Sequence, residues 1–238
     1  MIRYERQQAL LALLKEKNIM TVHEISKLLY ISEASVRRDI EELERQSSVK
    51  RIYGGVMLAA ARNSVIPLNL RDNINSSAKE EIAQKAASII SDGDTVLMDG
   101  SSTVRRILKY IGDKKNIKII TNNLRIFEEY ADSGVTLYCT GGTYLTENRI
   151  FIGSSAENYL RSVHANLLFF SSQGISENGE ISDASEAETS LRKVMLERAD
   201  KAYFLCDDSK YGVKKTFTLC HKSAVTDVIC NTPLSWTD

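Results

Sequence analysis

The chain has 238 residues, 43% of them hydrophobic and 26% charged, a composition that is ordinary for a soluble globular protein and, at this length, favours two domains. No apolar run reaches the roughly 18 residues needed to cross a bilayer, and the N-terminus lacks a signal-peptide profile, so we expect a cytoplasmic protein without a membrane partner. The four cysteines show no close paired spacing and the three histidines are far apart, which predicts neither a disulfide framework nor a bound metal.

Charge is unevenly distributed along the chain, although its net charge is +0. Residues 1–71 hold 12 lysines and arginines against 8 acidic residues, a net charge of +4, which leaves the remainder at −4. This asymmetry is typical of a DNA-facing head on an acidic body.

Three helical patterns follow one another near the N-terminus. From Arg3 to Lys17 the leucines recur at helical spacing. Thr21 and Glu24 have the spacing of a capping box, which predicts a second helix, and Ser32 is placed to cap a third. Two short helices separated by about four residues form the pattern of a helix-turn-helix.

The third helix has suitable residues where a recognition helix meets DNA. Ser35, Arg37 and Arg38 lie in its N-terminal part, which enters the major groove in a helix-turn-helix. An arginine can bridge guanine O6 and N7 or hold a phosphate, and a serine can make shorter contacts. On charge alone a solvated helix face is the better interpretation, because neighbouring acidic residues balance the arginines.

The segment Val49–Val56 favours DNA binding over a solvated face. Its pattern predicts a strand, a glycine turn and a second strand, which together form the wing of a winged helix-turn-helix. Lys50 and Arg51 would then lie beside the phosphate backbone.

These N-terminal residues resemble the DeoR (deoxyribonucleoside regulator) family of bacterial repressors. The resemblance is carried by Glu5-Arg6, by Ser32–Ile40 with Leu43-Glu44, and by the wing Arg51-Ile52-Tyr53-Gly54-Gly55. It implies a DNA-binding domain over residues 1–57 that contacts double-stranded operator DNA through Ser32, Ser35, Arg37, Arg38, Lys50, Arg51, Tyr53 and Gly54. The family usually has threonine at position 35 and a glycine near residues 46–48, where this chain has Gln-Ser-Ser.

A second domain is predicted over residues 78–238, after a linker at 58–77 that lacks clear periodicity. Ser77 and Glu80 have the spacing of another capping box, which predicts a helix that runs to about Ile90. Beyond it strands and helices alternate, a pattern typical of a mostly parallel α/β sheet.

Polar residues gather in the loops that follow the predicted strands. Ligands of such sheets bind outside the carboxyl ends of the strands, and hydroxyls with free backbone N–H groups suit a phosphate. These loops hold Asp99, Ser101, Ser102 and Thr103, then Thr121, Asn122 and Asn123, then Gly141 and Gly142, and finally Lys210. Each residue alone has an ordinary explanation as a cap, a turn or a surface lysine, but four such loops on one sheet favour a ligand site.

The same loops are similar to the effector domain of the DeoR family, which resembles ribose-5-phosphate isomerase and glucosamine-6-phosphate deaminase in fold. The resemblance extends from Glu5 to about Lys210 and implies a phosphorylated sugar as ligand. It places Ser101, Ser102 and Thr103 around the phosphate with Lys210 nearby, and Asp99, Asn122 and Asn123 at sugar hydroxyls. The family often has glycine at position 101 and fewer hydroxyls in the stretch 171–175, so a less common ligand is compatible with this chain.

Two other functions are compatible with parts of the sequence. A sugar-phosphate isomerase or deaminase needs an acidic or histidine base, and Asp183, Glu186 and Glu188 form the acidic cluster that could reach the site, although we expect them to cap and solvate the following helix. An architectural DNA-binding protein with a ligandless domain would not need the polar loops. We therefore expect a non-enzymatic repressor of sugar-metabolism genes without a cofactor, a homodimer or homotetramer, whose operator binding a sugar phosphate modulates.

Overall fold

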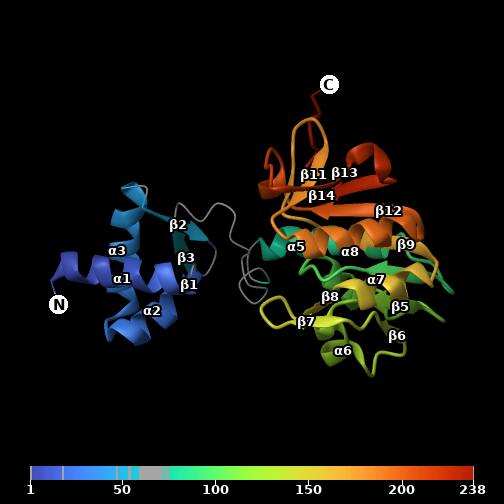
Figure 1. The fold of residues 1–238 in the computed structure, drawn as a ribbon, viewed down its shortest axis with the longest axis horizontal. Helices are drawn as coiled ribbons and strands as arrows, with labels where there is room; N and C mark the ends of the chain where they lie inside the picture. Colours follow the sequence, from blue (N-terminus) through green and yellow to red (C-terminus); the bar gives the residue numbers. More distant parts are fainter. Residues whose placement is uncertain are drawn as a thin grey trace. The chain divides into compact units, whose positions relative to one another are not determined.

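The computed structural model describes residues 2–17, 19–46, 48–52, 55–58, 72 and 75–237. The chain divides into two compact units, residues 1–74 and 75–238 (Figure 1). Tyr53, Gly54 and most of the predicted linker lie outside the described residues. Within the described ranges, no helix is both long and apolar enough to cross a membrane.

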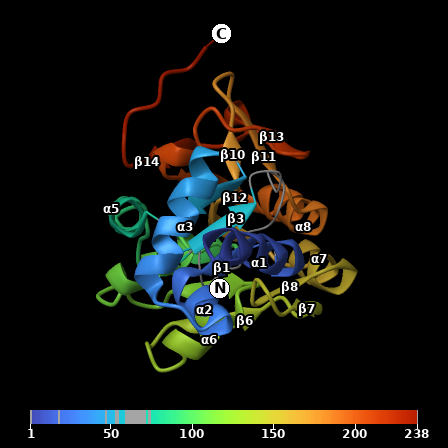
Figure 2. The same ribbon diagram turned by 90° about the vertical axis from the view of Figure 1, so that its left-hand side faces the viewer.

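In its described residues, the first unit has three helices and a small antiparallel sheet (Figure 2). Its elements are α1 (Arg3–Lys17), β1 (Ile19–Thr21), α2 (Val22–Leu29), α3 (Glu33–Arg45), β2 (Val49–Ile52) and β3 (Gly55–Leu58). The strands pair antiparallel in the order β1-β3-β2. This arrangement confirms the predicted wing hairpin and adds β1, a strand that the sequence pattern did not predict.

Both predicted helix caps of the first unit are confirmed. The Thr21 hydroxyl accepts from the Glu24 backbone N–H at 3.1 Å, and the Glu24 carboxylate accepts from the Thr21 N–H at 2.7 Å. The Ser32 hydroxyl accepts from the Ser35 N–H at 3.3 Å. Each cap satisfies N–H groups that the helix itself leaves unpaired, and so defines where α2 and α3 begin.

The second unit is built on a parallel six-stranded sheet in the order β14-β12-β9-β4-β5-β6. Its elements are α5 (Ser76–Ala87), β4 (Thr95–Met98), η1 (Val104–Tyr110), β5 (Lys118–Thr121), α6 (Leu124–Tyr130), β6 (Thr136–Cys139), β7 (Thr143–Leu145), β8 (Ile150–Ile152), α7 (Ser154–Arg161), β9 (Ala165–Phe170), β10 (Gly174–Ile175), β11 (Glu180–Asp183), α8 (Glu186–Glu197), β12 (Ala199–Cys206), η2 (Asp208–Lys210), β13 (Phe217–His221), η3 (Lys222–Ala224) and β14 (Asp227–Cys230). The predicted mostly parallel α/β sheet is confirmed. The β7–β8 hairpin and the small antiparallel sheet β10-β11-β13 are additions.

Helices cover both faces of the parallel sheet, because successive strand residues point to opposite sides. In β4, Val96 and Met98 face a core shared with α5, η1 and α6, whereas Leu97 faces a core shared with α7 and α8. In β9, Phe169 and Phe170 divide in the same way. With both faces buried, the loops at the carboxyl ends of the strands remain as the place for a ligand.

The start of α5 differs from the prediction. The helix begins at Ser76 and ends at Ala87, and its N-cap is Asn75 in a left-handed conformation without a side-chain cap, so the capping box predicted at Ser77 is wrong. The Asn75 side chain is engaged elsewhere, since its Nδ2 donates to Asp207 Oδ1 at 2.7 Å. A tertiary contact with the loop after β12 therefore replaces the local cap.

Candidate functional site

The exposed face of α3 carries the predicted recognition residues. Arg37 and Arg38 are exposed, and Arg37 Nη2 donates to Glu33 Oε2 at 2.6 Å one helical turn earlier. Ser32 is exposed and Ser35 half-buried, with 3.0 Å between their hydroxyl oxygens. The N-terminal part of α3 thus presents two guanidinium groups beside two hydroxyls, the groups expected at base edges and phosphates.

The wing lies against the recognition helix. Lys50 and Arg51 of β2 are both exposed, and the Arg51 guanidinium lies 3.2 Å from the Glu44 carboxylate and 3.5 Å from the Arg37 carbonyl oxygen. A Cβ on Gly55 would lie 2.7 Å from a backbone carbonyl oxygen of β1, so only glycine fits where β3 approaches that strand. These contacts fix the cations of the wing relative to those of α3. The predicted contacts of Tyr53 and Gly54 stay predictions, because both residues lie outside the described ranges.

Arg6 and Asp39 explain why charged residues occur in the buried seam between α1 and α3. Asp39 is only 1% exposed, and Arg6 binds both of its carboxylate oxygens, at 2.8 and 3.0 Å. A bidentate pair of this kind has a defined orientation as well as favourable energy. The pair therefore fixes the orientation of α3 relative to α1.

In the second unit, two lysine ammonium groups lie beside serine hydroxyls in the loops after the strands. Lys210 Nζ donates to Ser171 Oγ at 2.7 Å, and Lys79 Nζ of α5 donates to Ser102 Oγ at 3.3 Å. Burial alone would raise the pKa of Asp207, but Lys210, two hydrogen bonds and Lys79 lower it below its usual value, so that carboxylate stays charged between the two lysines. The region combines two cations, two hydroxyls and one anion.

Several predicted ligand residues have buried polar atoms without a hydrogen-bond partner among the described residues. These atoms are Thr103 Oγ1, Asn122 Oδ1 and Asn123 Nδ2, and Asn148 Oδ1 is a further one. Asn122 is held in place, because its Nδ2 donates to the Phe151 carbonyl oxygen at 3.0 Å. Since a buried polar atom without a partner costs free energy, such a set is typical of a site that a bound ligand or water completes.

Other predicted site residues shape the loops. The Ser101 hydroxyl accepts from a backbone N–H three residues later at 3.2 Å, and the Thr121 hydroxyl accepts from one two residues later at 3.0 Å. Gly141 and Gly142 have φ values of +63° and +111°, and a Cβ on Gly142 would lie 2.5 Å from a carbonyl oxygen of β8. These two glycines are therefore already required by the turn into β7.

Asp99 belongs to a buried ion cluster centred on Arg192. The guanidinium of Arg192 lies 2.7 Å from Asp99, 3.0 Å from Asp183 and 2.8 Å from Glu188, and all four side chains are at most 5% exposed. The expectation that the acidic cluster solvates the helix is wrong for Asp183 and Glu188, although Glu186 is exposed. Desolvation alone would lower the pKa of Arg192, but the three carboxylates raise it, so the cluster holds the loop after β4 against α8 and β11.

Lys79, Ser171 and Asn148 are site residues that were not selected from the sequence. A signal for Lys79 exists, because it shares the helical stripe of Ile82 and Ala83 in α5 and is only 3% exposed. A lysine on a buried apolar stripe needs a partner or a ligand. Asn148 carries no comparable signal, since the loop that places it depends on the β7–β8 hairpin.

Both units match models of one protein family. Residues 6–62 match the DeoR-like helix-turn-helix domain, and residues 74–232 match the DeoR C-terminal sensor domain. The chain belongs to the DeoR family. It is therefore a DNA-binding transcriptional regulator with a sensor domain for a small-molecule effector.

The curated relatives of this DeoR-family chain are named as regulators, and the sequence similarity extends over most of each chain. It is 30% identical to the uncharacterized HTH-type transcriptional regulator YulB of Bacillus subtilis, covering 96% of this chain and 87% of that protein. It is 33% identical to the HTH-type transcriptional repressor GlcR of Bacillus subtilis (89% and 82%), and 27% identical to the L-fucose operon activator of Haemophilus influenzae (96% and 92%). These relatives confirm a regulator rather than an enzyme.

Solved structures agree on the fold of the sensor domain. The crystal structure of eIF2B delta from Chaetomium thermophilum matches with a TM-score of 0.52 at 20% identity, over 70% of this chain and 59% of that one. Ribose 5-phosphate isomerase A from Neisseria gonorrhoeae matches with a TM-score of 0.42 at 13% identity, over 59% of this chain and 54% of that one. The first likeness shows a shared α/β fold and nothing about function.

Proposed function

We propose that this regulator represses sugar-metabolism genes and that a phosphorylated sugar, bound in the loops after β4, β5 and β12, modulates its affinity for operator DNA. The observation that carries the proposal is the placement of Lys79 and Lys210, each with its ammonium beside a serine hydroxyl. Lysine is a common phosphate ligand, and a phosphate beside the two hydroxyls would give both ammonium groups an anionic acceptor, which binds an ammonium more strongly than a hydroxyl does.

The sugar part of the proposed ligand rests on the side-chain amides. Asn122 Oδ1 and Asn148 Oδ1 can accept from hydroxyl groups, and Asn123 Nδ2 can donate to one. Thr103 Oγ1 can do either. A polyol carrying a phosphate satisfies both sets of groups, whereas an apolar ligand would leave the amides unpaired. Asp99 contributes only indirectly to binding of the proposed sugar, because Arg192 and two backbone N–H groups already bind its carboxylate.

Repression is proposed from the winged helix-turn-helix together with the relative named as a repressor. A single recognition helix reads a short site, so we propose a homodimer or homotetramer that places paired α3 helices on repeated half-sites. The sugar phosphate would favour an arrangement that no longer matches the spacing of those half-sites. Typical allosteric coupling of about 1–3 kcal/mol would change operator affinity roughly 5- to 150-fold.

A thermal-shift screen against phosphorylated sugars and their unphosphorylated counterparts tests the ligand. We expect at least one phosphosugar, and not its free sugar, to raise the melting temperature, since binding at 100 times Kd contributes about 2.7 kcal/mol. The combined variant Lys79→Met, Lys210→Ala should lose the shift. Lys118→Ala is the matched control, because this exposed lysine begins β5 at the end of the strand away from the loops. If the double variant still shows the rise in melting temperature, the ligand binds at another site.

A second measurement tests regulation. Operator affinity is measured at fixed salt with and without the phosphosugar that the screen identifies. Equal affinity in both conditions would contradict the proposed modulation and leave the DNA-binding function intact.

A further inference from the structure

Two cysteines face each other across neighbouring strands. Cys206 and Cys230 are register partners on the parallel strands β12 and β14, and both pack into the same core on one face of the sheet. Neighbouring strands lie about 4.8 Å apart, which falls within the Cα separation of roughly 4.4–6.8 Å that a disulfide spans. Both thiols are free, and at this separation of the strands a bond between them would need little movement of the backbone.

The two thiols differ in access and acidity. Cys206 is fully buried, whereas Cys230 is half-buried and lines a cavity of about 560 Å³ beside the edge strand β14, together with Lys85 and Lys222. The pKa of Cys230 is lowered to about 6, chiefly because the Cys206 thiol donates a hydrogen bond to it. The same interaction, together with burial, raises the pKa of Cys206. Cys230 is therefore the accessible thiolate and Cys206 the protonated neighbour.

We propose that Cys206 and Cys230 form a redox-active dithiol, which hydrogen peroxide entering this cavity oxidises to a disulfide. The Cys230 thiolate attacks one peroxide oxygen, the O–O bond breaks, and the departing hydroxide takes up a proton to become water. The Cys206 thiol then attacks the sulfenic sulfur of Cys230, and the S–O bond breaks with loss of a second water. Two thiols thus lose two electrons and two protons, and hydrogen peroxide is reduced to two waters.

The disulfide would act on the loop that follows β12. Cys206 directly precedes Asp207 and the short helix that carries Lys210, and the Asp208 N–H donates to Asn231 Oδ1 at 3.0 Å. A covalent link between the strands that end at these residues would restrict the loop further. The consequence for effector binding rests on the proposed function, but the formation of the disulfide does not.

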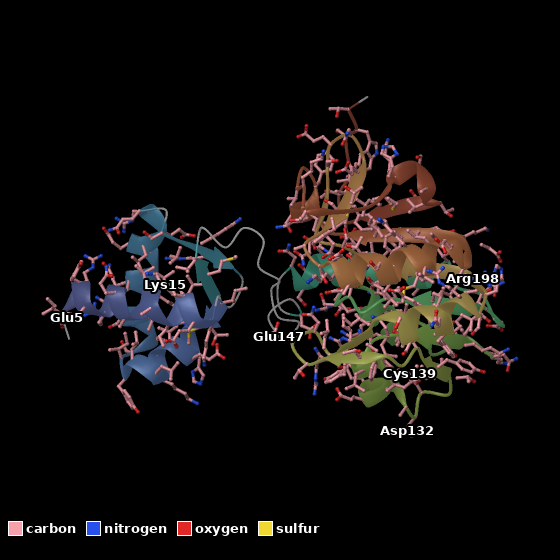
Figure 3. All side chains as sticks on the ribbon, viewed as in Figure 1. Glu5, Lys15, Asp132, Cys139, Glu147 and Arg198 are labelled. Carbon is pink, nitrogen blue, oxygen red and sulfur yellow. The ribbon has the colours of Figure 1, made fainter. Side chains whose placement is uncertain are left out.

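The test uses the full-length chain carrying Cys139→Ser and Cys220→Ser, so that only this pair remains. Cys139, which is labelled in Figure 3, lies on β6, and β6 and β14 are the two opposite edges of the six-stranded sheet. After reduction, hydrogen peroxide at pH 7 should remove two hydrogen atoms from the intact mass and produce a peptide cross-linked through Cys206 and Cys230. Hydrogen exchange of residues 207–211 should be slower in the oxidised protein.

Substitutions at Cys206 separate the redox role from simple packing. Cys206→Ser keeps a hydrogen-bond donor but cannot form the disulfide, whereas Cys206→Ala removes both. With Cys206→Ser, the midpoint of the Cys230 alkylation rate against pH should stay below the ordinary thiol value, as in the wild-type chain measured alongside. With Cys206→Ala the midpoint should rise towards the ordinary thiol value of about 8.5. Equal midpoints in the two variants, or peroxide treatment without the cross-link, would overturn the proposal, and neither readout requires a sugar phosphate.

Discussion

Tyr30 is a single residue whose backbone conformation conflicts with its side chain. It ends α2 with φ of 54°, in the left-handed region, and its side chain is 94% exposed, so little packing offsets the strain. A non-glycine residue in this region costs about 1 kcal/mol or more. We expect Tyr30→Gly to raise the free energy of unfolding of the first unit by about 0.5–1 kcal/mol, measured by urea denaturation.

Tyr4→Gly is the matched control for this prediction. Tyr4 is also largely exposed but has a helical conformation in the first turn of α1, where glycine should lower the free energy of unfolding slightly. The same substitution should therefore have opposite signs at the two positions. Loss of stability at both would show that the Tyr30 side chain contributes more than its exposure indicates.

Arg38 is the residue at which DNA recognition can be measured most directly. Arg38→Ala should weaken operator binding by about 1–3 kcal/mol at fixed salt. Arg45→Ala removes the same charge from the other end of α3, where the guanidinium lies within 4 Å of Glu41 and Glu42, and should have a smaller effect. Equal losses would indicate a general effect of charge rather than a contact made by the N-terminal part of the helix.

Arg192 joins three parts of the second unit through its ion pairs. Arg192→Met would leave three buried carboxylates without their common cation, and breaking a buried ion pair in this way typically costs about 3–5 kcal/mol. We expect a loss of that size in the free energy of unfolding. Lys193→Met, one residue later and exposed, should change stability by less than about 0.5 kcal/mol. Similar values for both variants would mean that the cluster contributes no net stability.

The elements that the sequence predicts well are those defined by local signals. α1 has the expected bounds, and the caps at Thr21 and Ser32 are where the pattern indicates, because these signals lie within a few residues of each other. β1 and the β7–β8 hairpin were missed, since strands of three residues are defined mainly by their pairing partners. The capping box predicted at Ser77 failed for the same reason, because a distant contact outweighed the local pattern.

The candidate site shows the same difference between what local signals predict and what tertiary contacts decide. The polar loops after the strands were selected because a parallel sheet brings its carboxyl ends together whatever the details of packing. Lys79 and Arg192 were not selected, because helices cross the sheet at angles that the sequence does not specify. Sequence reasoning thus selected the loops of the candidate site, and that choice stays a prediction, whereas the ion pairs that hold those loops needed the tertiary structure.

At the scale of the whole molecule, the chain contains two compact units, one a DNA-binding domain and the other a sensor domain. Each unit has its own apolar cores, and the described side chains of those cores belong to one unit only. A ligand that binds one folded unit stabilises that unit in proportion to RT ln(1 + [L]/Kd). Calorimetry of the full chain should therefore show two transitions, with operator DNA raising one melting temperature and the phosphosugar from the screen raising the other. If either ligand raised both transitions equally, the units would unfold cooperatively, and the coupling between sensing and DNA binding would lie in a shared interface rather than in the arrangement of independent units.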